Sequence, residues 1–187
     1  AIWALVEAHY ADISRPLQIA LSFDEEVGCT GAPPMIKAMQ GVLPKGDVVI
    51  VGEPSMMKAV TGHKGGNAYM THIIGFEVHS SIYYQGVSAI HEAARLIQWA
   101  NEQNESNAAA TPAPMAAMFD PPYTTWHVGT IEGGTADNIT AKDCHFNMGY
   151  RAVPGDDPVA LDAMYFAKVN EVKAAMQAIH PEADIKL

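Results

Sequence analysis

Hydrophobic and polar positions follow two different repeats in the first third of the chain. Residues 17–23 alternate apolar with polar or small side chains, which predicts a half-buried strand. Residues 47–51 form a short apolar run that ends at Gly52, as expected of a buried parallel strand. Residues 1–10 place apolar side chains close to helical spacing, and a second helix is predicted at residues 32–39, where Pro33 and Pro34 fit a first turn. We therefore predict the order α-β-α-β, part of a doubly wound, open parallel sheet of the α/β class.

The pattern changes near Thr61, where we place a boundary between domains of residues 1–61 and 62–187. In the second domain, strand and helix patterns follow the order β-α-β-β-α-β, which is typical of a ferredoxin-like α+β unit. The strands are predicted at residues 67–74, 126–131, 139–150 and 183–187, and the helices at residues 87–102 and 158–179. Residues 104–122 are rich in Asn, Ala and Pro and are predicted to form a flexible connection.

Charge and composition exclude some classes of binding partner. With 11 Lys and Arg against 21 Asp and Glu, the formal net charge is −10. An acidic surface repels phosphate groups, so we expect neither nucleic acid nor an anionic membrane as a partner. No apolar run approaches the roughly 18 residues that a spanning helix needs. Cys29 and Cys144 form no paired motif, which is typical of a reducing compartment, so we expect a cytoplasmic location.

Carboxylate side chains follow both predicted strands of the first domain. Asp24, Glu25 and Glu26 come directly after the first strand, and Glu53 follows the second. Because the carboxyl ends of parallel strands share one edge of a sheet, we expect these groups to lie near one another. Carboxylate oxygens bind zinc, and a neighbouring free carboxylate can act as a general base. An acidic triplet is more often a solvated turn, and both interpretations stay open at this point.

The chain has eight histidines, and two of them lie in patterns that can be tested against known sites. His79 lies where a predicted strand gives way to a loop, so it either serves a site or caps the next helix. His91 does not begin a metalloprotease motif, because residue 95 is Arg where a second His would be required. The remaining histidines considered have no recognisable partners and are predicted to be ordinary surface or core side chains: His9, His72, His127, His145 and His180.

Eight segments, taken in order, resemble the zinc-dependent peptidase family that includes acetylornithine deacetylase and succinyl-diaminopimelate desuccinylase. Two resemble the metal-site segments of that family, at residues 22–32 and 51–55. Six resemble its lid domain, at residues 62–65, 78–81, 86–90, 121–125, 128–138 and 151–155. Each motif is weak alone, but the ordered set covers most of the chain. The segments 121–125 and 132–136 look most similar to the acetylornithine deacetylase branch.

This resemblance implies a metal-dependent amidohydrolase in which residues 1–61 are part of a catalytic zinc-peptidase domain. Glu25 would be the general base, Glu26 would bind one zinc ion and Glu53 the other, with cobalt as a possible substitute. The remaining metal ligands of the family are expected outside this chain, which begins without Met inside a helical pattern. We therefore interpret the chain as an internal piece of a longer protein and expect it to be inactive alone.

The resemblance also implies that residues 62–187 form a lid through which two copies associate as a homodimer. His79 would reach into the active site of the partner subunit and stabilise the oxyanion. Asn138 and Arg151 would help to hold the carboxylate or backbone of the substrate. The sequence departs from the family at Thr140, where proline is common, and this departure weakens the assignment of a substrate.

The substrate implied by the resemblance is a small N-acyl amino acid, with N-acetylornithine favoured, which would place the protein in arginine biosynthesis. Two alternatives stay open. The protein could be a desuccinylase, dipeptidase or carboxypeptidase of the same family. This chain could also serve only as a non-catalytic dimerisation module.

Overall fold

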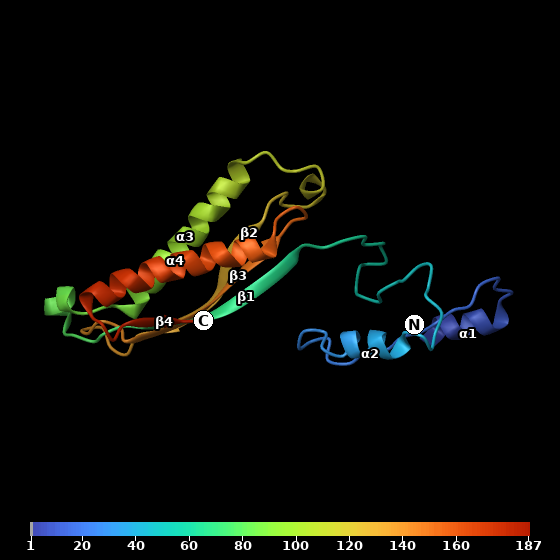
Figure 1. Ribbon diagram of the computed structural model, residues 1–187, viewed down its shortest axis with the longest axis horizontal. Coiled ribbons are helices and arrows are strands. Elements are labelled where there is room, and N and C mark those ends of the chain that lie inside the picture. Colours follow the sequence, from blue (N-terminus) through green and yellow to red (C-terminus); the bar gives the residue numbers. More distant parts are fainter. Residues whose placement is uncertain (1) are drawn as a thin grey trace. The chain divides into compact units, whose positions relative to one another are not determined.

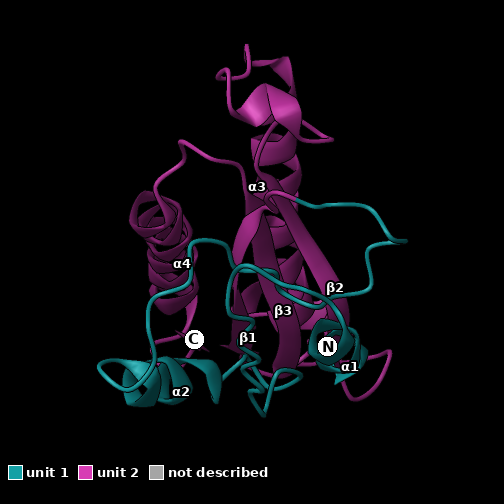
Figure 2. Ribbon diagram, turned by 90° about the vertical axis from the view of Figure 1, so that its right-hand side faces the viewer, with its two compact units in different colours: residues 1–60 teal, residues 61–187 magenta. Residues whose placement is uncertain are grey.

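The computed structural model describes residues 2–187 and divides into two compact units, residues 1–60 and residues 61–187. Figure 2 shows the two units in different colours. Each unit is held by contacts within itself. No helix among residues 2–187 is long and apolar enough to cross a membrane.

The first unit contains two helices, α1 (Ile2–Tyr10) and α2 (Ala32–Met39). Two prolines at the start of α2 fit its first turn, where the missing amide hydrogen has no helical partner. The strands predicted at residues 17–23 and 47–51 are not formed, and that prediction is wrong. Val48 to Val51 are 76–89% exposed. A strand needs a neighbour to complete its backbone hydrogen bonds, and none of the residues 2–60 supplies one.

The second unit is a four-stranded sheet, called the lid sheet from here on, with two long helices (Figure 1). Its elements in chain order are β1 (Gly65–Ile74), η1 (Ser80–Gln85), α3 (Ala89–Ala109), η2 (Ala116–Met118), β2 (Thr125–Gly133), β3 (Asp143–Ala152), α4 (Pro158–Ile179) and β4 (Asp184–Lys186). The spatial order is β2-β3-β1-β4, and all three neighbouring pairs are antiparallel. The mixed α/β fold with a β-α-β-β-α-β order is thus confirmed.

Both long helices cover one face of this sheet (Figure 1). Alternate side chains of β3, among them Cys144, Phe146 and Met148, are at most 1% exposed. They pack in one core cluster with apolar side chains of α3 and α4 such as Leu96 and Tyr165. The intervening side chains of the strands project from the opposite face, which no helix of this unit covers. This open face carries the polar groups considered below.

Helix α3 is longer than its periodicity predicts. A flexible connection was expected to begin at Asn104, but the helix continues to Ala109. The Asn104 side chain accepts a hydrogen bond from the Trp126 amide at 2.7 Å and donates to the Trp126 carbonyl at 2.8 Å. Asn107 donates to the Thr124 carbonyl at 2.9 Å. These bonds to the start of β2 offset the low helix propensity of asparagine, a tertiary effect that local pattern does not reveal.

Candidate functional site at the ends of the lid sheet

The loop that carries His79 is held in place by short backbone bridges. After β1, Phe76 pairs with Val87, and His79 pairs with Ile139, both antiparallel. Gly75 allows the close approach that this requires, because a Cβ there would lie only 2.2 Å from the Val87 carbonyl oxygen. The His79 backbone is extended and caps the short helix η1. His79 is therefore an exposed side chain on a well-anchored loop.

The hydrogen bonds of the His79 ring define which nitrogen is free. The backbone amide of Ser81 donates to Nδ1 of His79 at 3.3 Å, and the Ser81 hydroxyl lies 2.8 Å from the same nitrogen. Because an amide can only donate, Nδ1 is an acceptor, and a neutral ring then carries its proton on Nε2. The exposed Nε2–H is available as a donor to a developing negative charge. His79 can therefore cap the short helix through Nδ1 and donate a hydrogen bond through Nε2 at the same time.

The structure brings Asn138 next to this loop. The carbonyl oxygen of Asn138 accepts a hydrogen bond from the Ser80 amide at 2.9 Å, and the Asn138 side chain is exposed. His79 and Asn138, which are far apart in the sequence, therefore lie at the same end of the lid sheet.

Thr140, where the family often has proline, links the two segments further. Its amide donates to the Val78 carbonyl at 2.9 Å. Its hydroxyl accepts from the Val78 amide and donates to the Phe76 carbonyl, both at 2.9 Å. Proline has neither the amide hydrogen nor the hydroxyl. The departure from the family pattern therefore adds hydrogen bonds that hold the segment before His79.

Arg151 lies at the other end of the sheet. In the pairing of β1 with β3, Gly66 is opposite Arg151, whereas Ile74 is opposite Asp143. At about 3.4 Å per residue, Asp143 and Arg151 are separated by about 27 Å along the strand. The bridge between His79 and Ile139 continues from the Asp143 end. The structure thus does not bring Arg151 together with His79 in one copy of the chain.

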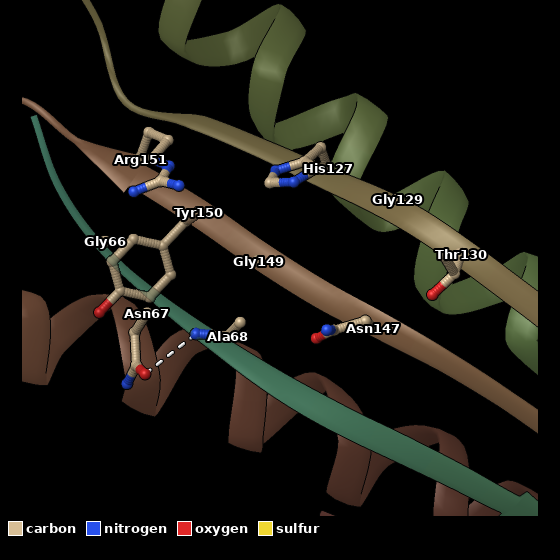
Figure 3. Close-up of a pocket in the computed structure, with 10 residues that line it drawn as sticks. All are labelled: Gly66, Asn67, Ala68, His127, Gly129, Thr130, Asn147, Gly149, Tyr150 and Arg151. Atoms are coloured by element: carbon tan, nitrogen blue, oxygen red, sulfur yellow. Dashed lines mark hydrogen bonds between the residues drawn. The ribbon is translucent and has the colours of Figure 1, made fainter. Parts of the chain in front are cut away.

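A trough of about 380 Å³ lies beside Arg151 on the open face of the sheet (Figure 3). Its floor consists of residues with little or no side chain, namely Gly66, Ala68, Gly129 and Gly149. The Arg151 guanidinium lies over Gly66, where a Cβ would come within 3.0 Å of Nη1. The small residues on the floor therefore create the hollow that a larger side chain would fill.

Polar groups line the walls of the trough. Figure 3 labels Arg151, His127, Asn147 and Thr130, and all four side chains are exposed. The His127 ring lies over Gly149, where a Cβ would meet it at 3.2 Å. No carboxylate among residues 2–187 forms an ion pair with Arg151. An unpaired guanidinium beside an open trough suits the bidentate binding of a carboxylate.

Thr124 anchors the strand that carries Arg151. It is 1% exposed, donates to the Asp156 carboxylate and accepts from the Val153 amide at 3.1 Å. Its neighbour Thr125 is paired with Arg151 in the sheet. Sequence reasoning gave Thr124 no role, although it lies in one of the family-like segments. The hydrogen bond from the Val153 amide to Thr124 therefore links two of the family-like segments, residues 121–125 and residues 151–155.

The side chains of Glu25, Glu26 and Glu53 are exposed and lie outside the two helices of the first unit. Glu25 begins a turn in which its carbonyl accepts hydrogen bonds from the amides of Gly28 and Cys29, both at 3.1 Å. Among residues 2–187, Glu25, Glu26 and Glu53 do not gather into a three-ligand group that could hold a metal ion. Their roles therefore remain predictions.

A different three-ligand group does occur. His72, Asp143 and His145 place one ligand atom each within 4.8 Å of the others. The expectation that His72 and His145 have no partners is wrong. The spacing of Asp143 and His145 puts them on one face of a strand, but only the register of β1 against β3 brings His72 beside them.

Comparison with known proteins identifies the class to which this fold belongs. Residues 61–177 match the M20 peptidase dimerisation domain. The chain therefore belongs to the M20 peptidase family, and the match begins at the first residue of the second structural unit and covers most of that unit.

The chain is similar to acetylornithine deacetylases over much of its length. It is 34% identical over 146 residues to the Myxococcus xanthus protein, which covers 78% of this chain and 37% of the relative. It is 30% identical over 178 residues to the Pasteurella multocida protein, covering 90% of this chain and 44% of the relative. The chain thus spans less than half the length of these relatives.

Two solved structures that match part of the chain share less sequence with it. A Burkholderia vietnamiensis amidase of the hydantoinase/carbamoylase family is 18% identical, with a TM-score of 0.49 over 66% of this chain and 26% of that one. A Staphylococcus aureus tripeptidase is 20% identical, with a TM-score of 0.41 over 68% of this chain and 31% of that one.

Proposed function

We propose that this chain is part of a dimeric, metal-dependent amidohydrolase that removes the acetyl group from an N-acyl amino acid, with N-acetylornithine as the favoured substrate. One observation carries the proposal. His79 and Asn138 lie together beyond the Asp143 end of β3, whereas Arg151 lies near the other end of that strand, about 27 Å from Asp143 at about 3.4 Å per residue. A small amino acid cannot span that distance, so one substrate needs these residues from two copies.

In this proposal, His79 of one subunit serves the site of its partner. Its exposed Nε2–H donates a hydrogen bond to the oxygen of the amide carbonyl as negative charge develops there. Removal of one such donor typically lowers the rate about 10²–10³-fold. Asn138, held beside the same loop through the Ser80 amide, supplies a neighbouring polar group that can orient the substrate.

Arg151 serves the other end of the substrate. Its unpaired guanidinium presents a planar pair of donors that matches the two oxygens of an α-carboxylate. The glycine-floored trough leaves room for that carboxylate to approach. Every N-acyl amino acid carries a free carboxylate, so this contact supports the substrate class and not a particular acyl group.

Glu25 is proposed to accept a proton from the attacking water and to return it to the leaving amine. Zinc, when bound, would polarise the amide carbonyl and acidify the water. Glu26 and Glu53 have the oxygen donors that zinc accepts, and both are exposed. Since residues 2–187 add no third ligand to them, these two side chains supply only part of such a site.

The first test is hydrolysis of N-acetylornithine, with zinc added, by the longer protein that contains this chain. Glu25→Gln should lower kcat about 10²–10⁴-fold, the usual contribution of a general base. Asp24→Asn is the matched control, because Asn keeps the size of Asp and tolerates its positive φ of 58°. An unchanged turnover rate in Glu25→Gln would show that the assigned role is wrong.

A second test addresses the shared site directly. His79→Ala and Arg151→Ala should each be nearly inactive alone. Mixed and allowed to exchange subunits, they should recover about one quarter of the wild-type activity, since half the dimers are mixed and each mixed dimer has one intact site. No recovery after verified exchange would mean that each site is built within one copy.

A substrate panel separates the remaining candidates. Activity on N-succinyl amino acids or dipeptides, but not on N-acetylornithine, would move the assignment to another branch of the family. If the intact protein hydrolysed none of these while light scattering showed a dimer, the function would be that of a dimerisation module. A strictly monomeric protein would contradict both the shared site and the module.

A further inference from the structure

The open face of the lid sheet contains a cluster of two histidines and one aspartate. His72 lies on β1, directly opposite His145 on β3, and Asp143 lies two residues before His145. Side chains two apart on a strand project from the same face, and so do directly paired residues. The three ligand atoms consequently lie within 4.8 Å of one another.

The contacts within this cluster are close. Nε2 of His72 lies 2.8 Å from Oδ1 of Asp143, and the rings of His72 and His145 stack with centroids 3.9 Å apart and an interplanar angle of 19°. Two imidazoles and one carboxylate form a ligand set that zinc uses in three-ligand protein sites. Zinc bonds of about 2.0–2.1 Å in a tetrahedron place ligand atoms about 3.3 Å apart. Binding would separate the stacked rings, because each ring must point one nitrogen at the ion, and all three side chains are at least partly exposed.

Charged neighbours on both flanking strands face the cluster. Glu132 of β2 is paired with His145, and Lys186 of β4 is paired with His72. Both side chains are exposed. Glu132 therefore lies where its carboxylate can supply the fourth ligand. Lys186 has the opposite effect, because its positive charge weakens the binding of a cation.

We propose that His72, Asp143 and His145 form a binding site for a divalent transition-metal ion, with zinc as the best match to the ligand set. Glu132 or water completes the coordination. The ion bridges β1 and β3, the two central strands of the sheet, and so stabilises the lid from the face that no helix covers. None of these three residues is among those to which the family resemblance assigns zinc, so the proposal does not depend on the proposed function.

The test is zinc titration of the 187-residue chain by calorimetry, combined with thermal unfolding. His145→Ala and Asp143→Asn should each weaken zinc binding at this site at least about tenfold, because loss even of an outer-shell partner typically has that effect. They should also abolish the rise in Tm that saturating zinc produces in the wild-type chain. Lys186→Gln should tighten zinc binding.

The matched control is His127→Ala, which removes another exposed histidine of the open face, on β2, outside the cluster. It should leave zinc binding unchanged. Circular dichroism verifies that each variant is folded, and His72→Gln replaces His145→Ala if that variant is not. Absence of zinc binding by the wild-type chain, or equal binding by the wild type and the cluster variants, would overturn the proposal.

Discussion

The backbone amide of Ser81 donates a hydrogen bond to Nδ1 of His79 at 3.3 Å, and the Ser81 hydroxyl lies 2.8 Å from the same nitrogen. This arrangement leaves Nε2 as the nitrogen that carries the proton in a neutral ring, and the residue is exposed. The direction of that N–H bond is the property on which the proposed role of His79 depends.

Ser81→Ala should lower kcat about 3- to 10-fold, because it removes one hydrogen bond that orients the ring while the amide contact remains. KM should change little, since Ser81 does not touch the substrate in the proposed arrangement. Steady-state kinetics of the intact protein measure both constants. Ser80→Ala is the control, because no hydrogen bond of the Ser80 side chain is present in the described chain, and it should behave as wild type.

Thr140→Val should lower the free energy of unfolding by about 1–3 kcal/mol. Thr140 is 8% exposed, and its loss leaves the Val78 amide and the Phe76 carbonyl without the hydroxyl. Urea denaturation measures the difference. Thr130→Val, at an exposed position, should change stability by at most about 0.5 kcal/mol. Equal stability of the two variants would show that the hydroxyl of Thr140 does not hold the loop.

Asn104→Ala should also destabilise the fold, by about 1–3 kcal/mol, despite the higher helix propensity of alanine. Both polar groups of the Trp126 backbone would lose their partner. Asn101→Ala, an exposed position on the same helix, should be neutral or slightly stabilising. Thermal unfolding of the two variants distinguishes the tertiary effect from the propensity effect. A stabilised Asn104→Ala variant would contradict the bonding described.

Stability should decline at high pH because of buried tyrosine. Burial raises the pKa of Tyr165 to about 12, although its hydrogen bond with Thr71 acts in the opposite direction. The pKa of an unfolded tyrosine is about 10, so between pH 10 and 12 the unfolded state loses a proton that the folded state keeps. The free energy of unfolding therefore falls with rising pH in this window, by up to about 2–3 kcal/mol.

Tyr165→Phe should make this decline shallower, whereas Tyr83→Phe, which changes an exposed ring, should not. Chemical denaturation at a series of pH values gives the slopes. Tyr150 contributes in the same direction, since burial, followed by its bond with Asp162, raises the pKa of its hydroxyl to about 12. Part of the decline will consequently persist in the Tyr165→Phe variant. If the free energy of unfolding fell equally steeply with pH in the wild type and in Tyr165→Phe, Tyr165 would not be a cause of the decline.

Local pattern predicted the lid well. Helix α4 spans Pro158–Ile179, the bounds expected from its periodicity and its initial proline, and Asp157 caps it by accepting from the Val159 amide at 2.9 Å. The bounds and the cap of a helix depend only on residues within a few turns of one another. The same reasoning failed for residues 17–23 and 47–51, because a strand is stable only when another strand satisfies its backbone, and pattern alone does not show whether one is present.

By itself, the sequence determined the order of helices and strands in residues 61–187 and the family to which they belong. The periodicity of side chains and the motifs are local properties, so they can be recognised without coordinates. Only the tertiary structure decided which distant residues meet. His72 and Asp143 are 71 residues apart and touch through strand register. His79 and Arg151 lie at opposite ends of one sheet because strand order and pairing, which are long-range properties, place them there.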